Sequence, residues 1–205
     1  MWVNADEPQG HAVAEAVQVL NSGQLLVAPT ETRYGLLARS DNVAALESLF
    51  HAKGRASETP VSVFVKDEQG IAELGEINHA ARALLRHHLP GPLTLVLNAR
   101  PALKAPIAVN GKIGIRYSSS PLIREIIRKM DVPLTATSAN LSGGPESVRI
   151  SEITILFRDQ VGLYLDCGDL INPVSSVVDC SVDPPTMLRS GAISESSIRE
   201  TLKAL

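Results

Sequence analysis

Hydrophobic residues recur along this chain at two spacings, one typical of amphipathic helices and one typical of strands. Helical spacing predicts helices over residues 10–21, 41–54, 78–88, 122–130, 153–157 and 194–205. Runs of aliphatic and β-branched residues predict strands over residues 24–28, 61–65, 93–97, 113–117, 134–137, 162–166, 174–179 and 186–188. Residues 29–37 match neither pattern. The alternation predicts an α/β fold with a sheet of mixed direction, formed by one domain over residues 1–205.

Short polar residues mark where two of these helices begin. Asp41 is the predicted N-cap of the second helix, which should stop at Gly54, and Ser194 is the predicted N-cap of the last. The expected apolar face of the second helix consists of Val43, Leu46, Leu49 and Phe50.

Composition places the chain among soluble globular proteins, with 44% hydrophobic and 20% charged residues. Aromatic residues make up only 3%, so the core must be built from Ala, Val, Leu and Ile. No apolar run approaches the roughly 20 residues that cross a membrane, and the first residues do not form a signal peptide. Two cysteines, Cys167 and Cys180, neither form a disulfide framework nor have zinc-site spacing. We therefore expect a reduced, cytoplasmic setting.

Charge is distributed unevenly, although the net charge is only −3. Residues 100–149 hold eight Lys and Arg against three acidic residues, whereas residues 150–205 hold four against eight. The acidic total argues against a general nucleic-acid coat, and the basic middle indicates a local anion site. Arg124, Arg128 and Lys129 follow helical spacing and are explained by a solvated helix face.

Several common site motifs are missing from the sequence. It has no GxxxxGK[ST] phosphate loop, no GxGxxG after the first strand and no GxSxG elbow. The five histidines form no HExxH motif, and adjacent His87 and His88 point in different directions on a helix. We therefore predict no protein-held metal site.

Four polar segments follow predicted strands or helices, where α/β proteins place their ligands. The first, Pro29–Gly35, suits a small polar ligand or an ordinary capped turn. In the second, Lys53–Pro60, Lys53 and Arg55 either bind phosphates or complement the end of a helix.

The third segment, residues 112–116, places Lys112, Gly114 and Arg116 on one strand face, which lines a cavity or faces solvent. The fourth, residues 134–143, combines hydroxyls, an amide and glycines after an apolar strand, and it is the clearest ligand-binding signal. Together the four segments indicate an anion or nucleotide site.

In order, these segments resemble the YrdC-like family, the threonylcarbamoyl-AMP synthases, in its short single-domain form. The family pattern includes PT[DE]TxYGL, KxR, PGPxT, GIR, SANxSG and a late S[ST]xxD…LRxG. The chain supplies it at Pro29–Leu36, Lys53 and Arg55, Pro90–Thr94, Gly114–Arg116, Ser138–Gly143, Ser175–Asp179 and Leu188–Gly191. The resemblance implies a twisted mixed sheet, flanked by helices, around a large basic cavity.

The resemblance also implies roles for individual residues. The residues expected to contact ATP are Arg55, Thr59, Lys112, Ser138 and Arg189, with Asn140 shaping the loop and Lys53 adding positive charge. Those expected to hold L-threonine are Thr32, Arg116, Ala136 and Ser175. Lys53 and Arg55 are the residues expected to matter most for catalysis.

The implied reaction joins L-threonine, bicarbonate and ATP into threonylcarbamoyl-AMP, which a downstream complex uses to modify tRNA. Magnesium is expected on the phosphates of ATP. Two alternatives stay open: a module that binds RNA through the same basic concavity, and a paralogue that forms a different adenylate, such as a carbamoyl adenylate.

The chain departs from the family pattern at several positions near the expected pockets. Arg33 replaces a small apolar residue, Leu37 replaces a glycine, and residues 118–120 replace a segment that usually carries a histidine. Phe64 and Glu146 stand where some relatives have ligand-contacting polar groups. These departures lie close to the expected amino-acid and nucleotide pockets. They therefore bear on which acceptor the protein uses, more than on its fold.

Overall fold

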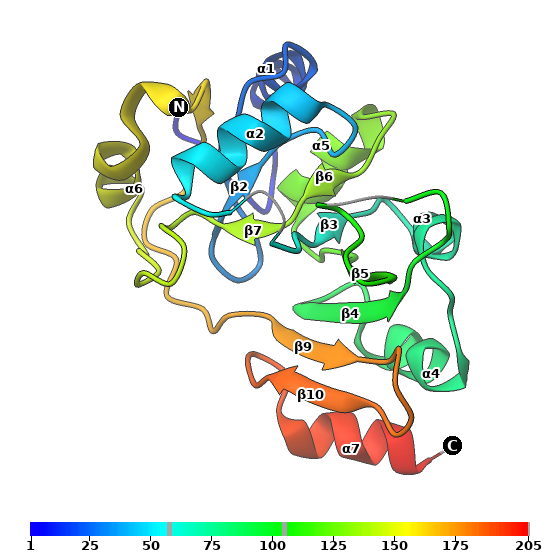
Figure 1. Cartoon of the computed structure of the whole chain (residues 1–205). Coiled ribbons are helices and arrows are strands. Elements are labelled where there is room, and N and C mark those ends of the chain that lie inside the picture. Colours follow the sequence, from blue (N-terminus) through cyan, green and yellow to red (C-terminus); the bar gives the residue numbers. More distant parts are fainter. Residues whose placement is uncertain (57–58, 104–105, 205) are drawn as a thin grey trace.

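The strands of this protein form two sheets, as a computed structural model of residues 1–56, 59–103 and 106–204 shows (Figure 1). The small sheet has the order β7-β2-β1-β8 and consists of β1 (Leu26–Pro29), β2 (Tyr34–Leu37), β7 (Thr137–Ser138) and β8 (Leu163–Tyr164). The large sheet has the order β10-β9-β4-β5-β3-β6. It consists of β3 (Val63–Phe64), β4 (Leu93–Asn98), β5 (Lys112–Arg116), β6 (Leu134–Thr135), β9 (Ser176–Asp179) and β10 (Thr186–Arg189).

Helices cover these sheets. They are α1 (Gly10–Asn21), α2 (Val43–Ala52), α3 (Glu68–Leu74), α4 (His79–His88), α5 (Pro121–Lys129), α6 (Ile150–Phe157) and α7 (Glu195–Lys203), with a 3₁₀ turn at Arg158–Gln160. Both sheets contain parallel and antiparallel pairs. The expected α/β fold with strands of mixed direction is therefore confirmed.

Alternation along β1 places the small sheet between two layers of helices. Leu26 and Ala28 pack with α1 and α5 on one face, and Val27 packs with α2 and α6 on the other. Successive strand residues point to opposite faces. A strand buried on both faces must therefore be apolar throughout, as β1 is.

One face of the large sheet packs on helices across β3, β4, β5 and β9. Leu95, Ile115 and Val178 join the side chains of α4 and α7 in one hydrophobic cluster. The residues between them, such as Thr94 and Arg116, point to the opposite face. At the β3–β6 end this second face packs on α5 through Phe64 and Leu134, whereas on β4 and β5 it carries the polar side chains of Thr94 and Arg116.

The chain passes from one sheet to the other at Ala136. Thr135 pairs with β3 of the large sheet, and Thr137 pairs with β2 of the small sheet. The backbone N–H of Ala136 donates to Ser62 O at 2.7 Å. The single strand expected over residues 134–137 is therefore two short strands in different sheets, and the two sheets meet there.

Three further expectations differ from the structure. Residues 34–37 form β2, although their sequence matched no pattern, because both faces of this strand are buried. Residues 68–74 form α3, which was not expected and which Asp67 caps by accepting from Gly70 N. The predicted strand over residues 61–65 is reduced to Val63–Phe64.

The N-cap of α2 is Asn42, and the prediction of Asp41 is wrong. Asn42 accepts a hydrogen bond from Ala45 N, whereas Asp41 pairs with Arg39. Val43, expected on the apolar face, is 69% exposed because it lies in the first turn on the solvent side. The N-cap predicted for the last helix, Ser194, is confirmed by its bond from Ser197 N.

Some predicted positions lie outside the described residues: positions 57–58 of the Lys53–Pro60 segment, Lys104 of the basic middle, and the terminal Leu205. Within the described ranges, no helix is both long and apolar enough to span a bilayer.

Candidate active site

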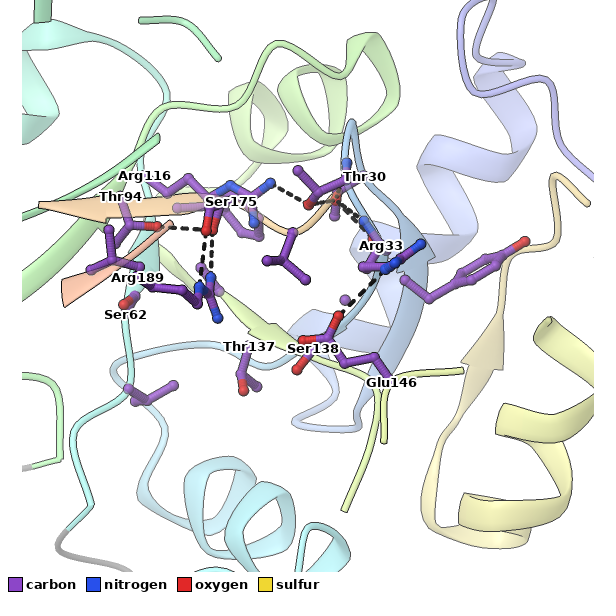
Figure 2. A pocket seen from close by; sticks show the side chains of 18 of the residues that line it. Thr30, Arg33, Ser62, Thr94, Arg116, Thr137, Ser138, Glu146, Ser175 and Arg189 are labelled. Atoms are coloured by element: carbon purple, nitrogen blue, oxygen red, sulfur yellow. Dashed lines mark hydrogen bonds and ion pairs between the residues drawn. The ribbon is translucent and has the colours of Figure 1, made fainter. Parts of the chain in front are cut away.

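A row of side chains across four strands of the large sheet forms one wall of a cavity between the two sheets. Phe64 of β3 lies beside Arg116 of β5, which lies beside Thr94 of β4, which lies beside Val177 of β9. All four residues line the cavity, in which Figure 2 shows Thr94 and Arg116, because they belong to the face opposite α4 and α7. The pairing register of the sheet thus brings together residues more than 100 positions apart in the chain.

The opposite wall comes from the β1–β2 turn and from β7. Thr30 organises that turn, since its hydroxyl donates to Arg33 O at 2.7 Å and accepts from the backbone N–H groups of Thr32 and Arg33. Gly35 pairs with Ser138 of β7. Thr30, Thr32, Gly35 and Ser138 all line the cavity, so this polar turn is a wall of the site as well as a connection.

Arg116 is held in place by three partners. Its Nε and Nη2 donate to Glu31 Oε1 at 3.2 and 2.8 Å, and Nη2 also donates to Thr32 Oγ1 at 2.6 Å. The guanidinium carbon lies 5.1 Å from the centre of the Phe64 ring, within cation–π range. Ser118 donates to the second oxygen of Glu31. The guanidinium therefore has a fixed orientation before any ligand binds.

Arg189 is held by the segment that enters β9. Its Nε donates to Ser175 O at 2.9 Å and its Nη2 donates to Ser175 Oγ at 2.7 Å. Gly191 makes this approach possible, because a Cβ there would lie 2.3 Å from Val174 O and 2.6 Å from the carbonyl carbon of Ser175. The glycine of the late LRxG motif thus has a steric explanation.

Lys53 and Asn140 hold the loop after β7 by hydrogen bonds, and neither side chain lines the cavity. Lys53 is buried, and its ammonium donates to Ser138 O at 2.5 Å and to Asn140 O at 2.8 Å. Asn140 Nδ2 donates to Leu141 O and Gly144 O, both at 2.8 Å. Asn140 Oδ1 accepts from the Ser138 hydroxyl at 2.5 Å. The free lone pairs of that hydroxyl are therefore left to accept a hydrogen bond.

Burial shapes the electrostatics of the site. It lowers the pKa of Lys53 to about 8, with the positive charge of Arg55 acting in the same direction and Glu146 opposing it. Burial also lowers the pKa of Arg55 and, together with nearby Arg116, that of Arg189. Guanidinium groups nevertheless stay charged. An anion bound among them would offset the cost of their desolvation.

Three buried polar atoms of the cavity have no hydrogen-bond partner among the described residues: Arg33 Nε, Arg55 Nε and Glu146 Oε2. A fourth such atom, Gln9 Oε1, lies elsewhere. Buried polar atoms normally have a hydrogen-bond partner, although Arg33 Nε and Glu146 Oε2 also face each other as an ion pair at 3.5 Å. Most unpaired buried atoms in the described part of the chain therefore gather at one cavity.

The structure brings most of the predicted site residues to this cavity. The predicted residues that line it are Thr32, Arg55, Arg116, Ala136, Ser138, Ser175 and Arg189. They come from both sheets and from the segments that connect them, over a range of 158 positions in the chain, from 32 to 189.

Four predicted site residues do not line the cavity. Lys53 and Asn140 lie beneath it, as described above, and Thr59 is outside its lining. Lys112 lies at the opposite end of β5 from Arg116, about 13 Å away along the strand. There its ammonium pairs with Asp179 Oδ2 at 2.9 Å. Of the expected strand face, only Arg116 reaches the cavity.

Some lining residues were not assigned a role from the sequence. Thr94 lines the cavity, and Glu31 binds Arg116 without being part of the lining; both belong to quoted motifs. Thr137 belongs to the fourth polar segment but was given no role, whereas Ser62 and Val174 carry no sequence signal, because only the packing of the two sheets brings them to the cavity. Gly114 makes room for Ser62, whose Oγ would lie 2.3 Å from an added Cβ.

Carboxylates are scarce at the cavity, where Glu146 is the only acidic residue among the described lining residues. Nowhere in the described part of the chain do three or more His, Cys, Asp or Glu side chains form a group that could hold a metal ion. A divalent cation here would need most of its ligands from a bound phosphate compound.

Comparisons with known proteins match one family model and several relatives over most of the chain. The Sua5/YciO/YrdC family model, described as "Telomere recombination", matches residues 18–191. A threonylcarbamoyl-AMP synthase of Bacillus subtilis is 31% identical over 98% of this chain and 58% of its own length. A relative from Mycobacterium tuberculosis H37Rv is 33% identical over 96% of this chain and 91% of its own length.

A solved structure of Pyrococcus abyssi Sua5 complexed with L-threonine has a TM-score of 0.91 and 27% identity. The match covers 98% of this chain and 61% of the Pyrococcus chain. This chain therefore spans less than two thirds of the Bacillus and Pyrococcus proteins but nearly all of the mycobacterial one.

Proposed function

This chain belongs to the Sua5/YciO/YrdC family, and on that premise we propose that it makes threonylcarbamoyl-AMP and pyrophosphate from L-threonine, bicarbonate and ATP. Relatives with this activity in their names support the proposal. So does the complex of a similar structure with L-threonine. Because both sheets line the same cavity, we also propose that residues 1–205 act as one domain.

The observation that carries the proposal is a pair of pre-oriented guanidinium groups in one cavity. Arg116 and Arg189 each use Nε and Nη2 to bind the protein. Among the described hydrogen bonds, none uses Nη1 of either residue. Each arginine can therefore offer donors to an anion without giving up the contacts that orient it. Two anionic groups, a carboxylate and a phosphate, fit such a cavity.

We assign the binding of threonine and of ATP to different residues, according to the charge and hydrogen-bonding groups of each substrate. Arg116 would bind the threonine carboxylate, beside Thr32, Ala136 and Ser175. Arg55 and Arg189 would bind phosphates, and the Ser138 hydroxyl would accept a hydrogen bond from the nucleotide. Lys53 and Asn140 would act by holding the loop that carries Ser138. Thr59 and Lys112 do not line the cavity, so we assign them no direct contact.

The reaction needs little covalent help from the protein. The threonine amine and bicarbonate would form a carbamate with loss of water. A carbamate oxygen would then attack the α-phosphorus of ATP, and the bond to the bridging oxygen would break, releasing pyrophosphate. The cavity would align two anions that otherwise repel each other and would neutralise the charge on the phosphates. Magnesium would enter as MgATP, because the described residues hold no cluster of metal ligands.

The product would serve a transferase complex that modifies tRNA, which would place this protein in the cytoplasm. RNA binding at the basic cavity remains an alternative to the enzymatic proposal. It predicts binding that weakens steeply with salt and that Arg116 substitution reduces.

Pyrophosphate release tests the proposal. With purified protein and ATP, release should require both L-threonine and bicarbonate, and omission of either should return it to background. Release that is independent of threonine, or that occurs with carbamoyl phosphate instead, would favour the paralogue with a different acceptor. No release from folded protein under any of these conditions would refute the synthase.

A further inference from the structure

A segment of three serines, residues 118–120, lies between β5 and α5, and it is one of the places where the chain departs from the family pattern. Ser118 is fully buried and Ser120 nearly so, whereas Ser119 is exposed. Ser118 is not among the described residues that line the cavity. It follows the strand that carries Arg116, and its hydroxyl reaches the partner of that arginine.

The Ser118 hydroxyl has two partners, and together they fix the direction in which it donates. Its oxygen accepts from Ser120 N at 3.1 Å, and a backbone N–H can only donate. The single proton of the hydroxyl therefore goes to Glu31 Oε2. A hydrogen bond from a hydroxyl to a carboxylate is charge-assisted and stronger than one between neutral groups.

Helix α5 anchors the serine segment, so the hydroxyl itself has a fixed position. Ser120 is the N-cap of this helix, and its side chain accepts from Ile123 N. Ile123 is buried in the hydrophobic core that α5 shares with α1 and β1. A connected series of hydrogen bonds therefore runs from the helix through Ser118 and Glu31 to Arg116.

Glu31 binds the guanidinium with one carboxylate oxygen and Ser118 with the other. Its Oε1 accepts from Arg116 Nε and Nη2 at 3.2 and 2.8 Å. Glu31 also lines a second cleft of about 530 Å³, which shares Thr30 with the cavity. Without the Ser118 proton, solvent in that cleft would compete for Oε2, and the carboxylate would rotate more freely. The two-point contact with Arg116 would then be present for less of the time.

The substrate carboxylate makes this restraint more important. Arg116 would then lie between two carboxylates, those of Glu31 and of L-threonine, which repel each other. The bond from Ser118 opposes any movement of Glu31 away from the guanidinium. It thereby keeps Glu31 on the Nε and Nη2 edge and leaves Nη1 for the ligand.

We propose that Ser118 is a positioning residue for L-threonine, acting through Glu31 on the orientation of Arg116. This inference rests on the proposed function, because it takes the threonine carboxylate to bind Arg116. It also gives a physical role to the serine segment: a buried hydroxyl supplies the donor that holds Glu31 in place.

Kinetics of threonine-dependent pyrophosphate release test the proposal with two neighbouring substitutions. Ser118→Ala should raise the KM for L-threonine about 3- to 10-fold, while kcat and the calorimetric Kd for ATP change less than about twofold. Ser119→Ala removes an exposed hydroxyl from the next position and is the matched control, with all three constants unchanged. Equal constants for the two folded variants would overturn the proposal. No threonine dependence in the unmodified protein would instead refute the proposed function, and this inference with it.

L-Threoninol, in which a hydroxymethyl group replaces the carboxylate, separates positioning from a general loosening of the cavity. Its inhibition constant against L-threonine should be the same in Ser118→Ala and in the unmodified protein, because it has no carboxylate for Arg116 to bind. The preference for L-threonine over L-threoninol should therefore narrow about 3- to 10-fold. Equal weakening of both compounds would overturn the positioning role.

A double-mutant cycle tests whether Ser118 acts through Glu31. Glu31→Gln keeps the shape of the side chain and removes its charge. In that background Ser118→Ala should change the KM for L-threonine less than about twofold, because the carboxylate that the hydroxyl holds is gone. Fully additive effects of the two substitutions in folded proteins would contradict the proposed route through Glu31.

Discussion

At the scale of single residues, the orientation of Arg116 is the feature on which threonine binding depends. Glu31, Thr32 and the Phe64 ring fix its guanidinium. Arg116→Lys keeps the charge but cannot bind Glu31 and present a second planar nitrogen at once. We expect the KM for L-threonine to rise about 10- to 100-fold and the Kd for ATP to change less than about threefold.

The control for this prediction is Arg128→Lys on α5, where the side chain is 66% exposed and pairs with Glu125. Both kinetic constants should stay unchanged there. If Arg116→Lys weakened ATP and threonine equally, Arg116 would serve the whole cavity rather than the amino acid.

Lys53 gives a prediction about pH. Its pKa is lowered to about 8 by burial, from an ordinary value of 10.5. Between these two pH values the unfolded chain binds a proton that the folded protein has released, so stability should rise with pH. The free energy of unfolding of the unmodified protein, minus that of Lys53→Met, should therefore increase from pH 8 to 10.5.

Chemical denaturation at several pH values in this interval measures that difference. Lys129→Met, on the exposed surface of α5, is the control and should give a flat difference. A difference that falls as pH rises would mean that the loop carbonyls hold the ammonium more strongly than burial disfavours it.

Seven of the cavity residues could be identified from the sequence, because the ordered segments that match the family pattern assign a role to each of these positions. The sequence could not place Lys112, because period-two alternation assigns a strand face but not a distance along the strand. It also could not show that the Lys53 ammonium donates to backbone carbonyls of the loop after β7. Two cations at the end of a helix have the same pattern whether they face a ligand or backbone carbonyls.

At the scale of elements, the N-cap of α2 separates two neighbouring residues. Asn42 accepts from Ala45 N, whereas Asp41 forms a surface pair with Arg39. Asn42→Ala should lower the free energy of unfolding by about 1 kcal/mol, and Asp41→Ala by less than about 0.5 kcal/mol. Urea denaturation of both variants checks this. The reverse order would restore Asp41 as the cap.

Long amphipathic elements were predictable because their burial repeats with the helical period, as in α1, α4 and α5. Short elements were not. β2 is only four residues long, and all four are buried, so no alternation distinguishes it. α3 is seven residues long with a single buried residue, Ile71. Local pattern cannot distinguish such segments from loops.

At the scale of the whole molecule, the cavity depends on both sheets and on the crossing at Ala136. A nucleotide bound between the sheets should therefore stabilise the entire fold in one transition. At an ATP concentration about 100 times its Kd, the free energy of unfolding should rise by about 2.7 kcal/mol. Denaturation monitored with and without ATP tests this, and separate transitions for the two sheets would contradict a single domain.

The α/β class followed from the alternation of elements, but the division into two sheets did not. Residues 134–137 read as one strand because the pattern is continuous and the partner of each residue is not encoded locally. The partner changes between Thr135 and Thr137. The polar segments indicated an anion or nucleotide site and the family resemblance implied a large cavity, but neither placed it at the junction of two sheets.

The central claim is that this cavity joins threonine, bicarbonate and ATP. The most direct measurement is mass spectrometry of the product formed from ATP, L-threonine and carbon-13 bicarbonate. We predict threonylcarbamoyl-AMP that carries the labelled carbon, together with pyrophosphate. An adenylate without the label, or no adenylate from folded protein that binds ATP, would contradict the account.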